Sequence, residues 1–336
     1  MEIENWDFRL SHFPSATFFH SAAWARVMHS TYGYQPVYFT LSECGRIQSL
    51  LPVMEVNSWL TGRRGISLPF TDECAPLCSD AASFHRLSEQ ATECAAARAW
   101  RYWECRGGRS WFGDVPASTS FYGHRLELQD DESALFARVD SSVRRAVRKA
   151  EQGGLTVEFS QELDAVRIFH RLLGRTRRRH GVPVQPFAFF RNIHRHVLSQ
   201  NLGWVVLARH GRVPVAGAMF FHFGRDAIYK FGASHEKFQL LRANNLVMWE
   251  AIKWYARRGF GSLDFGRTSL GNAGLRRFKL GWGTREHRVE YVRYDVPAGR
   301  FVTARDNSTG WHNRWFKIMP VFLTRLLGAA FYKHLA

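Results

Sequence analysis

One succession of predicted elements occurs twice along the chain, and it limits the fold more than any other feature. The first copy consists of two strands joined by a turn, then a helix and a strand, at 37–41, 47–56, 80–99 and 100–105. The second copy has an extra strand before its helix, at 204–208, 213–223, 227–232, 244–258 and 262–265. The pair Gly45-Arg46 of the first turn recurs as Gly211-Arg212. We interpret this as a repeat of architecture, which predicts an α/β chain with mixed sheets in two domains.

The size and charge of the chain agree with two soluble domains that bind an anion. A length of 336 residues suits two domains, and 46% hydrophobic residues are ample for two cores. Lys+Arg 46 against Asp+Glu 29 give a formal net charge of +17. This excess favours RNA, a phosphorylated substrate, a pyrophosphate cofactor or an anionic membrane surface as partner, without selecting among them.

The cysteines and the apolar runs indicate the cellular setting. The five cysteines show no repeated C-x-x-C pattern, which argues against zinc sites and a disulfide framework and favours a reduced compartment. The N-terminus is acidic and unlike a signal peptide, and no apolar run approaches the ~20 residues of a spanning helix. We therefore predict a cytoplasmic protein, at most peripheral at the inner membrane face, without a metal or a tightly bound cofactor.

Two predicted helices in the second half are strongly basic. A single helix over 130–153 carries Arg144, Arg145, Arg148 and Lys149. The next helix, from about Leu163, aligns four arginines opposite its apolar residues: Arg167, Arg171, Arg175 and Arg178. Such faces are usually solvated, and the alternative is that they hold the phosphates of tRNA or lipid.

The segment 264–283 combines a strand end, a polar loop and a short predicted helix. On that helix Leu275, Phe278 and Trp282 form an apolar stripe at i, i+3 and i+7. Lys279 lies only about 40° around the axis from Leu275, at the edge of the packed face, where a cation can be held in place. From this segment alone, the favoured interpretation is a surface lysine that extends beside the core.

The order of elements from Leu155 onward is that of the GNAT acyltransferase fold, and two such halves in tandem resemble the FemABX aminoacyltransferases. No nucleophile elbow, Walker A loop, dinucleotide fingerprint or H-E-x-x-H sequence points elsewhere. Short sequences along nearly the whole chain resemble FemAB-like proteins, including those associated with exopolysaccharide and PEP-CTERM systems. They are Phe18-Phe-His-Ser-x-x-Trp24, Val143 to Leu155, Arg177-Arg-Arg-His-Gly-Val-Pro183 with Phe189-Phe190, Tyr229-x-x-Gly-Ala-Ser234, Asn244-Asn245 with Trp249-Glu250, Asp264-Phe-Gly-Arg267, and Gly274-Leu-Arg-Arg-Phe-Lys279 with Trp282-Gly283. Each is weak alone, and their common order makes the resemblance specific.

The resemblance implies a domain plan and a reaction. Two GNAT-like domains are expected at 1–129 and 130–297, the second with the active site, and a helical tail at 298–336 that packs on the first domain. An alternative for the tail is an interfacial helix on a membrane. The implied reaction transfers an acyl or aminoacyl group to an amine of a cell-envelope or polysaccharide precursor. In FemABX enzymes the donor is aminoacyl-tRNA and the acceptor is a peptidoglycan precursor.

The same resemblance assigns roles to individual residues. The lysine of the family's Phe-Lys pair stabilises charge on the reacting carbonyl, and here that role falls on Lys279, because aminolysis builds an oxyanion. Asp264 is the second catalytic candidate, as acceptor of the amine's proton, although a strand-end carboxylate is more often a structural acceptor. The expected substrate-binding residues are Arg267, Phe278, Tyr229, Asn244, Asn245 and Arg177. The alternative interpretations are that Arg267 is a solvated loop arginine, that Tyr229 is a core residue and that Asn244 and Asn245 cap the following helix.

Two departures from related enzymes keep the donor open. GNAT enzymes that use acetyl-CoA usually have a glycine-containing loop before the central helix, and the segment 235–245 has no glycine. No long heptad arm like the coiled-coil insertion of some FemABX members is present. The leading hypothesis is therefore an acyl- or aminoacyltransferase that uses aminoacyl-tRNA or acyl-CoA as co-substrate and a phosphorylated or lipid-linked acceptor. The alternatives are a GNAT N-acyltransferase with acyl-CoA, and a non-catalytic protein that binds RNA or anionic lipid. The sequence does not determine the oligomeric state.

Overall fold

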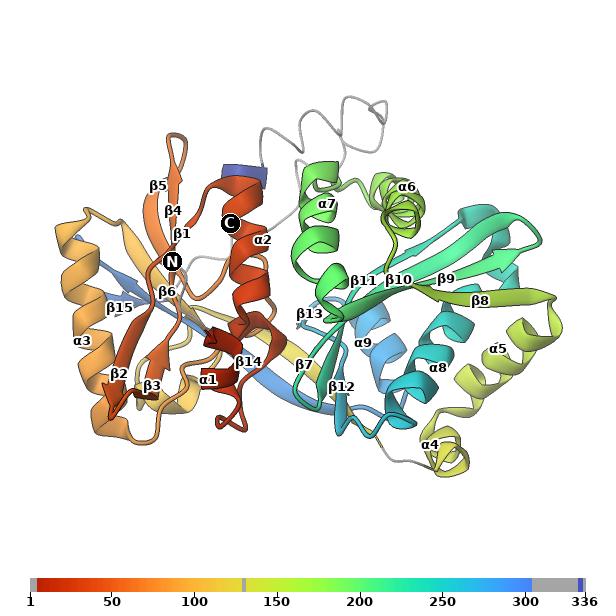
Figure 1. Ribbon diagram of the computed structural model, residues 1–336, viewed down its shortest axis with the longest axis horizontal. Helices are drawn as coiled ribbons and strands as arrows, with labels where there is room; N and C mark the ends of the chain where they lie inside the picture. The colour runs from red at the N-terminus through yellow and green to blue at the C-terminus, as the bar shows by residue number, and fades with distance from the viewer. Residues whose placement is uncertain (1–4, 129–130, 304–331, 335–336) are drawn as a thin grey trace. The chain divides into compact units, whose positions relative to one another are not determined.

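The computed structural model describes residues 5–128, 131–303 and 332–334 (Figure 1). Contacts within the chain divide these residues into two compact units. The first contains 5–122, 288–303 and 332–334, and the second contains 123–128 and 131–287. The domain limits expected from the sequence, 1–129 and 130–297, stay predictions.

The first unit combines a mixed sheet with a separate hairpin. The sheet strands follow the order β1 (Gln35–Pro36), β4 (Met54–Ser58), β5 (Gly62–Ile66), β6 (Tyr102–Arg106) and β14 (Arg285–Asp295), with β15 (Arg300–Val302) against β14. The hairpin consists of β2 (Phe39–Glu43) and β3 (Arg46–Leu51). The helices are α1 (Trp6–Leu10), α2 (Ala22–Tyr32) and α3 (Ala81–Ala97), with 3-10 turns η1 (Phe18–His20), η2 (Arg109–Phe112) and η5 (Tyr332–His334).

Helix starts in the first unit follow the capping residues in the sequence. The Ser21 side chain accepts from the Trp24 N–H at 3.4 Å, which confirms Ser21 as the cap of α2. The Asp80 carboxylate accepts from the Ser83 N–H at 2.8 Å and begins α3. The apolar face of α3, with Phe84 and Leu87, then packs into the core around Trp103.

The predicted strand at 47–56 is wrong, because two strands occupy this range. β3 ends at Leu51, and β4 begins at Met54. Between them stands Pro52, which has no N–H to donate to a strand ladder. β3 pairs with β2, whereas β4 pairs with β1 and β5, so the chain changes partners at this proline.

The sheet of the second unit is antiparallel except at one pair. Its strands follow the order β7 (Thr119–Glu127), β12 (Ser262–Asp264), β11 (Asp226–Ser234), β10 (Val213–Phe223), β9 (Gly203–His210) and β8 (Leu155–Ser160), with β13 (Thr268–Ser269) against β7. The pair β11–β12 is parallel, because α8 (Ala243–Ala256) connects the two strands. The other helices are α4 (Glu132–Arg138), α5 (Ser141–Gln152), α6 (Leu163–Arg179), α7 (Phe187–His196) and α9 (Ala273–Leu280), with 3-10 turns η3 (Leu198–Gln200) and η4 (Glu236–Leu241).

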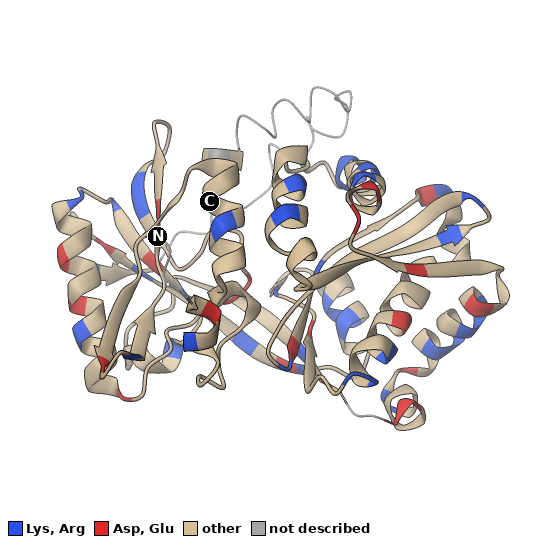
Figure 2. Ribbon diagram, in the orientation of Figure 1, with Lys and Arg blue, Asp and Glu red and all other residues tan. Residues whose placement is uncertain are grey.

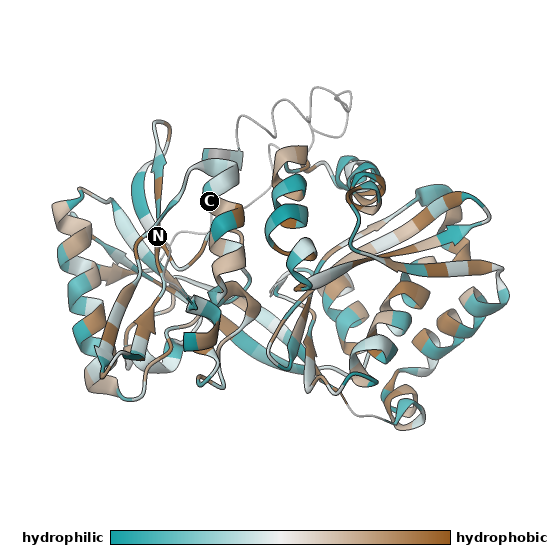
Figure 3. Cartoon of the chain, in the orientation of Figure 1, coloured by the Kyte–Doolittle hydropathy of each residue, from teal (hydrophilic) through white to brown (hydrophobic). Residues whose placement is uncertain are grey.

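Helices lie on both faces of this sheet, with α6 and α7 on one side and α5, α8 and α9 on the other (Figure 1). α8 is buried around most of its surface and supplies Leu246, Met248 and Tyr255 to the core. α6 buries Val166 and Phe169 and exposes Arg167 and the three other arginines of the predicted stripe, as the 3.6-residue period predicts. Figure 3 shows the corresponding contrast between hydrophobic strands and hydrophilic outer helix faces.

The predicted helix over 130–153 is broken, and two helices, α4 and α5, replace it. The break lies at Val139 and Asp140, both with extended ψ angles. The Asp140 N–H donates to the carbonyl oxygen of Gly281 at 2.9 Å, and the Asp140 carbonyl accepts from Arg144 within α5. Asp140 therefore stands at the N-cap of a second helix, a position that aspartate favours over helix interiors.

Most of the predicted tail at 298–336 lies outside the described residues, including 304–331 and 335–336. Residues 300–302 form β15, and Tyr332–His334 lie against the first unit, where the Tyr34 hydroxyl donates to the Tyr332 carbonyl at 3.5 Å. Within the described ranges, no helix is long and apolar enough to cross a membrane.

Candidate functional site

The parallel pair β11–β12 is short, and the sheet of the second unit opens where it ends. Only Asp226, Ala227 and Ile228 of β11 pair with β12. β12 stops at Asp264, whereas β11 continues to Ser234, so no described strand pairs with this edge of β11 beyond Ile228. The register between β10 and β11 also shifts next to Tyr229, as in a β-bulge. The end of the parallel pairing and a local kink therefore meet at one place.

A cavity of about 270 Å³ lies beside this open edge. Its walls come from the C-terminal end of α6, from β10 and β11, and from α8 and α9. The lining residues are Thr176, Arg179, His180, Gly217, Ala218, Tyr229, Gly232, Ala233, Ser234, Asn244, Val247, Met248, Leu275 and Phe278. The structure thus brings together three of the expected substrate-binding residues, Tyr229, Asn244 and Phe278.

Tyr229 and Gly232 shape the middle of this cavity. A Cβ on Gly232 would meet the Tyr229 hydroxyl at 1.8 Å, so only glycine leaves room for the phenol in this position. Burial raises the pKa of Tyr229 to about 12. The phenol therefore stays protonated at neutral pH and can donate a hydrogen bond to a ligand in the cavity.

A second cavity, of about 190 Å³, adjoins the first at the N-terminus of α8. Arg179, Ser234 and Asn244 line both cavities, and Arg242 and Asn245 line the second. Arg242 begins α8 in a left-handed conformation without a side-chain cap. A helix N-terminus flanked by Arg179 and Arg242 favours an anion. The segment before α8 folds as the 3-10 turn η4, with a left-handed arginine where glycine is common in related enzymes.

The helical spacing predicted that Lys279 lies at a surface edge. The structure places it inside the second unit instead. It is 3% exposed, whereas Leu275 is 37% exposed and lines the cavity with Phe278. The Lys279 Nζ donates to the carbonyl oxygens of Gly266 at 2.7 Å and Arg267 at 2.9 Å. The predicted position of the apolar stripe around the helix axis is therefore wrong. The sequence does not show that one side of α9 faces a cavity.

The loop that Lys279 binds contains two other predicted site residues. The Asp264 carboxylate accepts a hydrogen bond from the Gly266 N–H, so it organises the loop at the end of β12. Arg267 is half-buried, and its carbonyl faces Lys279. Arg177 lies on α6, but the described residues at that end of α6 that line the cavity are Thr176, Arg179 and His180.

A cluster of charged groups next to Lys279 was missed from the sequence. His124 of β7 is buried, and its Nε2 lies 3.2 Å from Oε2 of Glu286. Arg276 binds the same carboxylate through two hydrogen bonds of 2.7 and 2.8 Å. These bonds hold the pKa of Glu286 below its usual value, while burial and then the Lys279 charge lower the pKa of His124 to about 4. No sequence signal marks this cluster, because His124 is distant along the chain from Arg276 and Glu286 and meets them only in the folded unit.

The expected arginine stripe is present on the solvent face of α6. Arg167, Arg171, Arg175 and Arg178 are all exposed, and Arg167 pairs with Asp164 at 2.6 Å. Figure 2 shows these basic positions on α6 and further ones on α5 and α7. Among the described residues, no three His, Cys, Asp or Glu side chains gather as a metal site.

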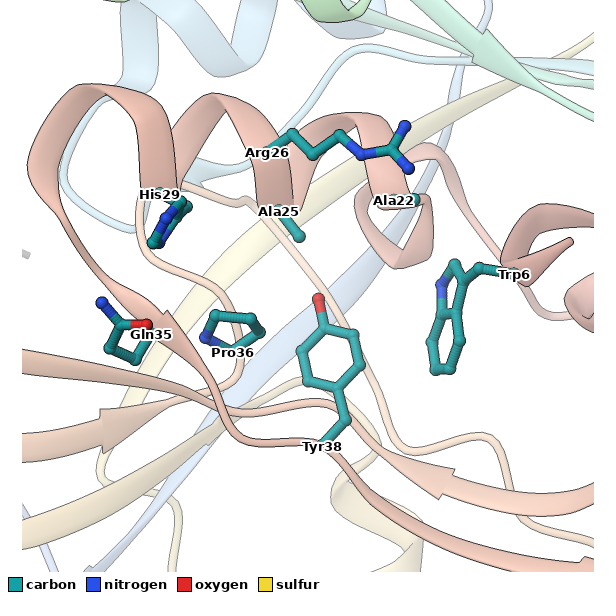
Figure 4. Close-up of a pocket in the computed structure, with 8 residues that line it drawn as sticks. All are labelled: Trp6, Ala22, Ala25, Arg26, His29, Gln35, Pro36 and Tyr38. Carbon is teal, nitrogen blue, oxygen red and sulfur yellow. The ribbon is translucent and has the colours of Figure 1, made fainter. Parts of the chain in front are cut away.

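A third cavity, of about 220 Å³, lies in the first unit between α2 and the chain from Gln35 to Tyr38 (Figure 4). Trp6, Ala22, Ala25 and Pro36 supply apolar walls. The Tyr38 hydroxyl points toward α2 in this view, and its oxygen is buried without a hydrogen-bond partner among the described residues. Burial raises the pKa of Tyr38 well above its usual value, so the group remains a neutral, unsatisfied phenol.

Comparison with known proteins identifies the fold around the main cavity. Residues 137–287 match the family model of the acetyltransferase (GNAT) domain. These residues have the GNAT fold. The structure of FemX is similar at a TM-score of 0.70 with 15% identity, over 86% of this chain and 96% of that one. No curated protein matches the sequence.

Two further structures share this fold at greater distance. One is the C-terminal domain of a protein assigned as a lysylphosphatidylglycerol synthetase from Agrobacterium fabrum, with a TM-score of 0.55, 15% identity and coverage of 80% and 86%. The other is a tandem GNAT protein from the clavulanic acid biosynthesis pathway, with a TM-score of 0.51, 11% identity and coverage of 78% and 83%. The expected fold class is confirmed, and so is the resemblance to FemAB-like GNAT proteins at the level of the fold.

Replacement of Gly232 by alanine tests the shape of the cavity. The new methyl group would displace the Tyr229 hydroxyl, and we expect a loss of roughly 1–3 kcal/mol in the free energy of unfolding, measured in urea. Gly271→Ala is the control, because a Cβ there meets no atom within 4 Å. Equal stability of the two variants would contradict the described position of the phenol.

The pKa of His124 predicts a dependence of stability on pH. In the unfolded chain, His124 takes up a proton as pH falls below its ordinary pKa of 6.5. In the folded protein the pKa of His124 is about 4, so this proton is taken up only at lower pH. The folded state therefore loses stability as pH falls from about 6.5 to about 4. His124→Gln should lose less stability between pH 7 and pH 5 than the parent protein in urea unfolding, and the exposed His85→Gln should behave like the parent. An unchanged pH dependence in His124→Gln would refute the assignment.

Tyr38→Phe removes the unsatisfied hydroxyl of the third cavity. A buried polar group without a partner costs about 1–3 kcal/mol, so we expect this variant to be as stable as the parent or more stable. Tyr291→Phe is the matched contrast, because the Tyr291 hydroxyl donates to the Asp72 carbonyl at 2.7 Å. That variant should lose about 1 kcal/mol in thermal or urea unfolding. A larger loss for Tyr38→Phe than for Tyr291→Phe would mean that the Tyr38 hydroxyl has a stabilising partner.

Proposed function

We propose that the protein transfers an acyl or aminoacyl group to an amine of a cell-envelope or polysaccharide precursor, at the open edge of β11. The observation that carries the proposal is the cavity along this edge, within the GNAT domain and next to an anion-binding helix end. FemX, whose fold this chain shares, supports an aminoacyl donor.

The reaction would use the described groups as follows. The amine nitrogen attacks the carbonyl carbon of the donor, and the C–O bond of an ester or the C–S bond of a thioester breaks. The proton that the amine loses goes to the departing oxygen or sulfur, so the products are an amide and a free hydroxyl or thiol. Tyr229 and Asn244 would bind the substrates in the cavity, and Arg179 and Arg242 would hold a donor phosphate. Lys279 would stabilise negative charge on the reacting carbonyl from its position beside Gly266 and Arg267.

Acyl-CoA is the second candidate donor, because the cavity at the N-terminus of α8 offers a place for its phosphates as well. Acyl-CoA presents a pyrophosphate to that helix end, and aminoacyl-tRNA presents nucleotide phosphates. Incubation of the purified protein with labelled aminoacyl-tRNA or labelled acyl-CoA and amine-bearing envelope precursors separates the donors. Absence of label transfer from both donors to every precursor would overturn the proposal.

Lys279→Met tests the role of the buried cation. The substitution preserves the length of the side chain but removes its charge, and we expect the transfer rate to fall by roughly 10²–10³-fold. Loss of two hydrogen bonds to carbonyl oxygens should also lower the free energy of unfolding by about 1–3 kcal/mol, so rates are compared where the variant is folded. The exposed Lys149→Met on α5 is the control and should keep both properties. A folded Lys279→Met variant with the parental rate would leave the lysine a structural role alone.

A further inference from the structure

The hairpin β4–β5 of the first unit ends in two exposed apolar side chains. Trp59 is 85% exposed and Leu60 is 51% exposed, and both belong to the turn between Ser58 and Gly62. The hairpin projects beyond the elements next to it in its unit (Figure 1). Adjacent large apolar residues at a projecting turn are unusual for a surface that contacts only water.

Polar contacts hold the turn from its inner side, and the Trp59 ring meets the His334 imidazole edge to face with centroids 5.5 Å apart. The Ser58 hydroxyl bonds to Nδ1 of His334 at 2.7 Å and accepts from the Thr61 N–H at 2.9 Å. Arg64 donates to the Thr61 hydroxyl at 2.6 Å, and Arg101 donates to the Thr61 carbonyl at 3.3 Å. These bonds satisfy polar groups of Ser58 and Thr61, the residues on either side of the tip, and hold the turn in one conformation.

The charge around the turn is positive. Arg63 and Arg101 are exposed, and the stem of Arg101 lies against Gly62, where an added Cβ would meet its Cδ at 2.6 Å. No acidic residue occurs from Val56 to Thr71, and the nearest one, Glu55, accepts from Arg98 and from the Trp100 indole. Figure 2 shows basic residues on the β5 arm.

We propose that this turn inserts into the surface of an anionic phospholipid bilayer. Tryptophan favours the interface between headgroups and acyl chains, and leucine favours the acyl region beneath it. Arg63 and Arg101 lie behind the tip, at the level where they meet the phosphates. A protein partner would fit the apolar tip but would not by itself require the two arginines behind it. The proposal goes beyond acyl transfer and does not depend on it.

Co-sedimentation of the full chain with lipid vesicles tests the proposal. The protein should bind vesicles that contain one-third phosphatidylglycerol in phosphatidylcholine, and it should bind pure phosphatidylcholine more weakly. The double substitution Trp59→Ser with Leu60→Ser should reduce the partition coefficient by roughly tenfold or more, because it removes the apolar contribution. Arg63→Gln should reduce it by about fivefold on the anionic vesicles only.

Phe8→Ala is the matched control, because Phe8 is another exposed aromatic residue of the first unit, at 79% exposure on α1. It should bind vesicles like the parent, and thermal unfolding should show that all variants are folded. The proposal is overturned if the parent does not bind anionic vesicles, if the double variant binds equally well, or if Phe8→Ala weakens binding as much as the double variant does. An indole emission shift on binding that disappears in Trp59→Phe would support insertion of Trp59 itself.

Discussion

The three paired residues between β11 and β12 are the constraint on which the second unit depends. α8 connects the two strands and forces them parallel, and the pairing stops at Ile228 and Asp264. The remaining edge of β11 must then satisfy its backbone groups from something other than a strand. A cavity lies there, lined by one end of α6 and by the faces of α8 and α9. The position of the cavity thus follows from where two strands stop pairing.

The buried charge of Lys279 holds the loop that follows β12. An ammonium group in the interior is costly unless oxygen atoms surround it, and Gly266 and Arg267 supply two carbonyl oxygens. Asp264 holds the same loop through the Gly266 N–H, so strand end, loop and helix α9 form one connected structure. The adjacent residue Phe278 turns to the cavity, since neighbours on a helix point about 100° apart. Lys279 therefore positions the loop, and Phe278 lines the cavity.

The sequence predicted the elements well and the site only partly, for physical reasons. The alternation of strands and helices, the Ser21 cap and the arginine face of α6 follow from local periodicity and capping, and all are present. Val139 and Asp140 interrupt a helical pattern because Asp140 bonds to Gly281, a contact between distant segments. The side of α9 that is buried, and the meeting of His124 with Glu286, also depend on tertiary packing. Residues of one site that lie on separate strands leave no pattern in a single sequence.

The first unit shows why the open edge is not a general property of this topology. Its strands β5 and β6 are also parallel and are connected by α3, and they pair at Gly65 with Trp103 and Ile66 with Glu104. Beyond this pair, however, the Ser67 N–H donates to the Glu104 carbonyl at 2.8 Å, and the Cys74 N–H donates to the Arg106 carbonyl at 2.7 Å. The chain between them bridges the strand ends, where Glu104 is buried with Arg106 and Arg293. The same arrangement of elements is therefore closed by its own chain in one unit and left open in the other.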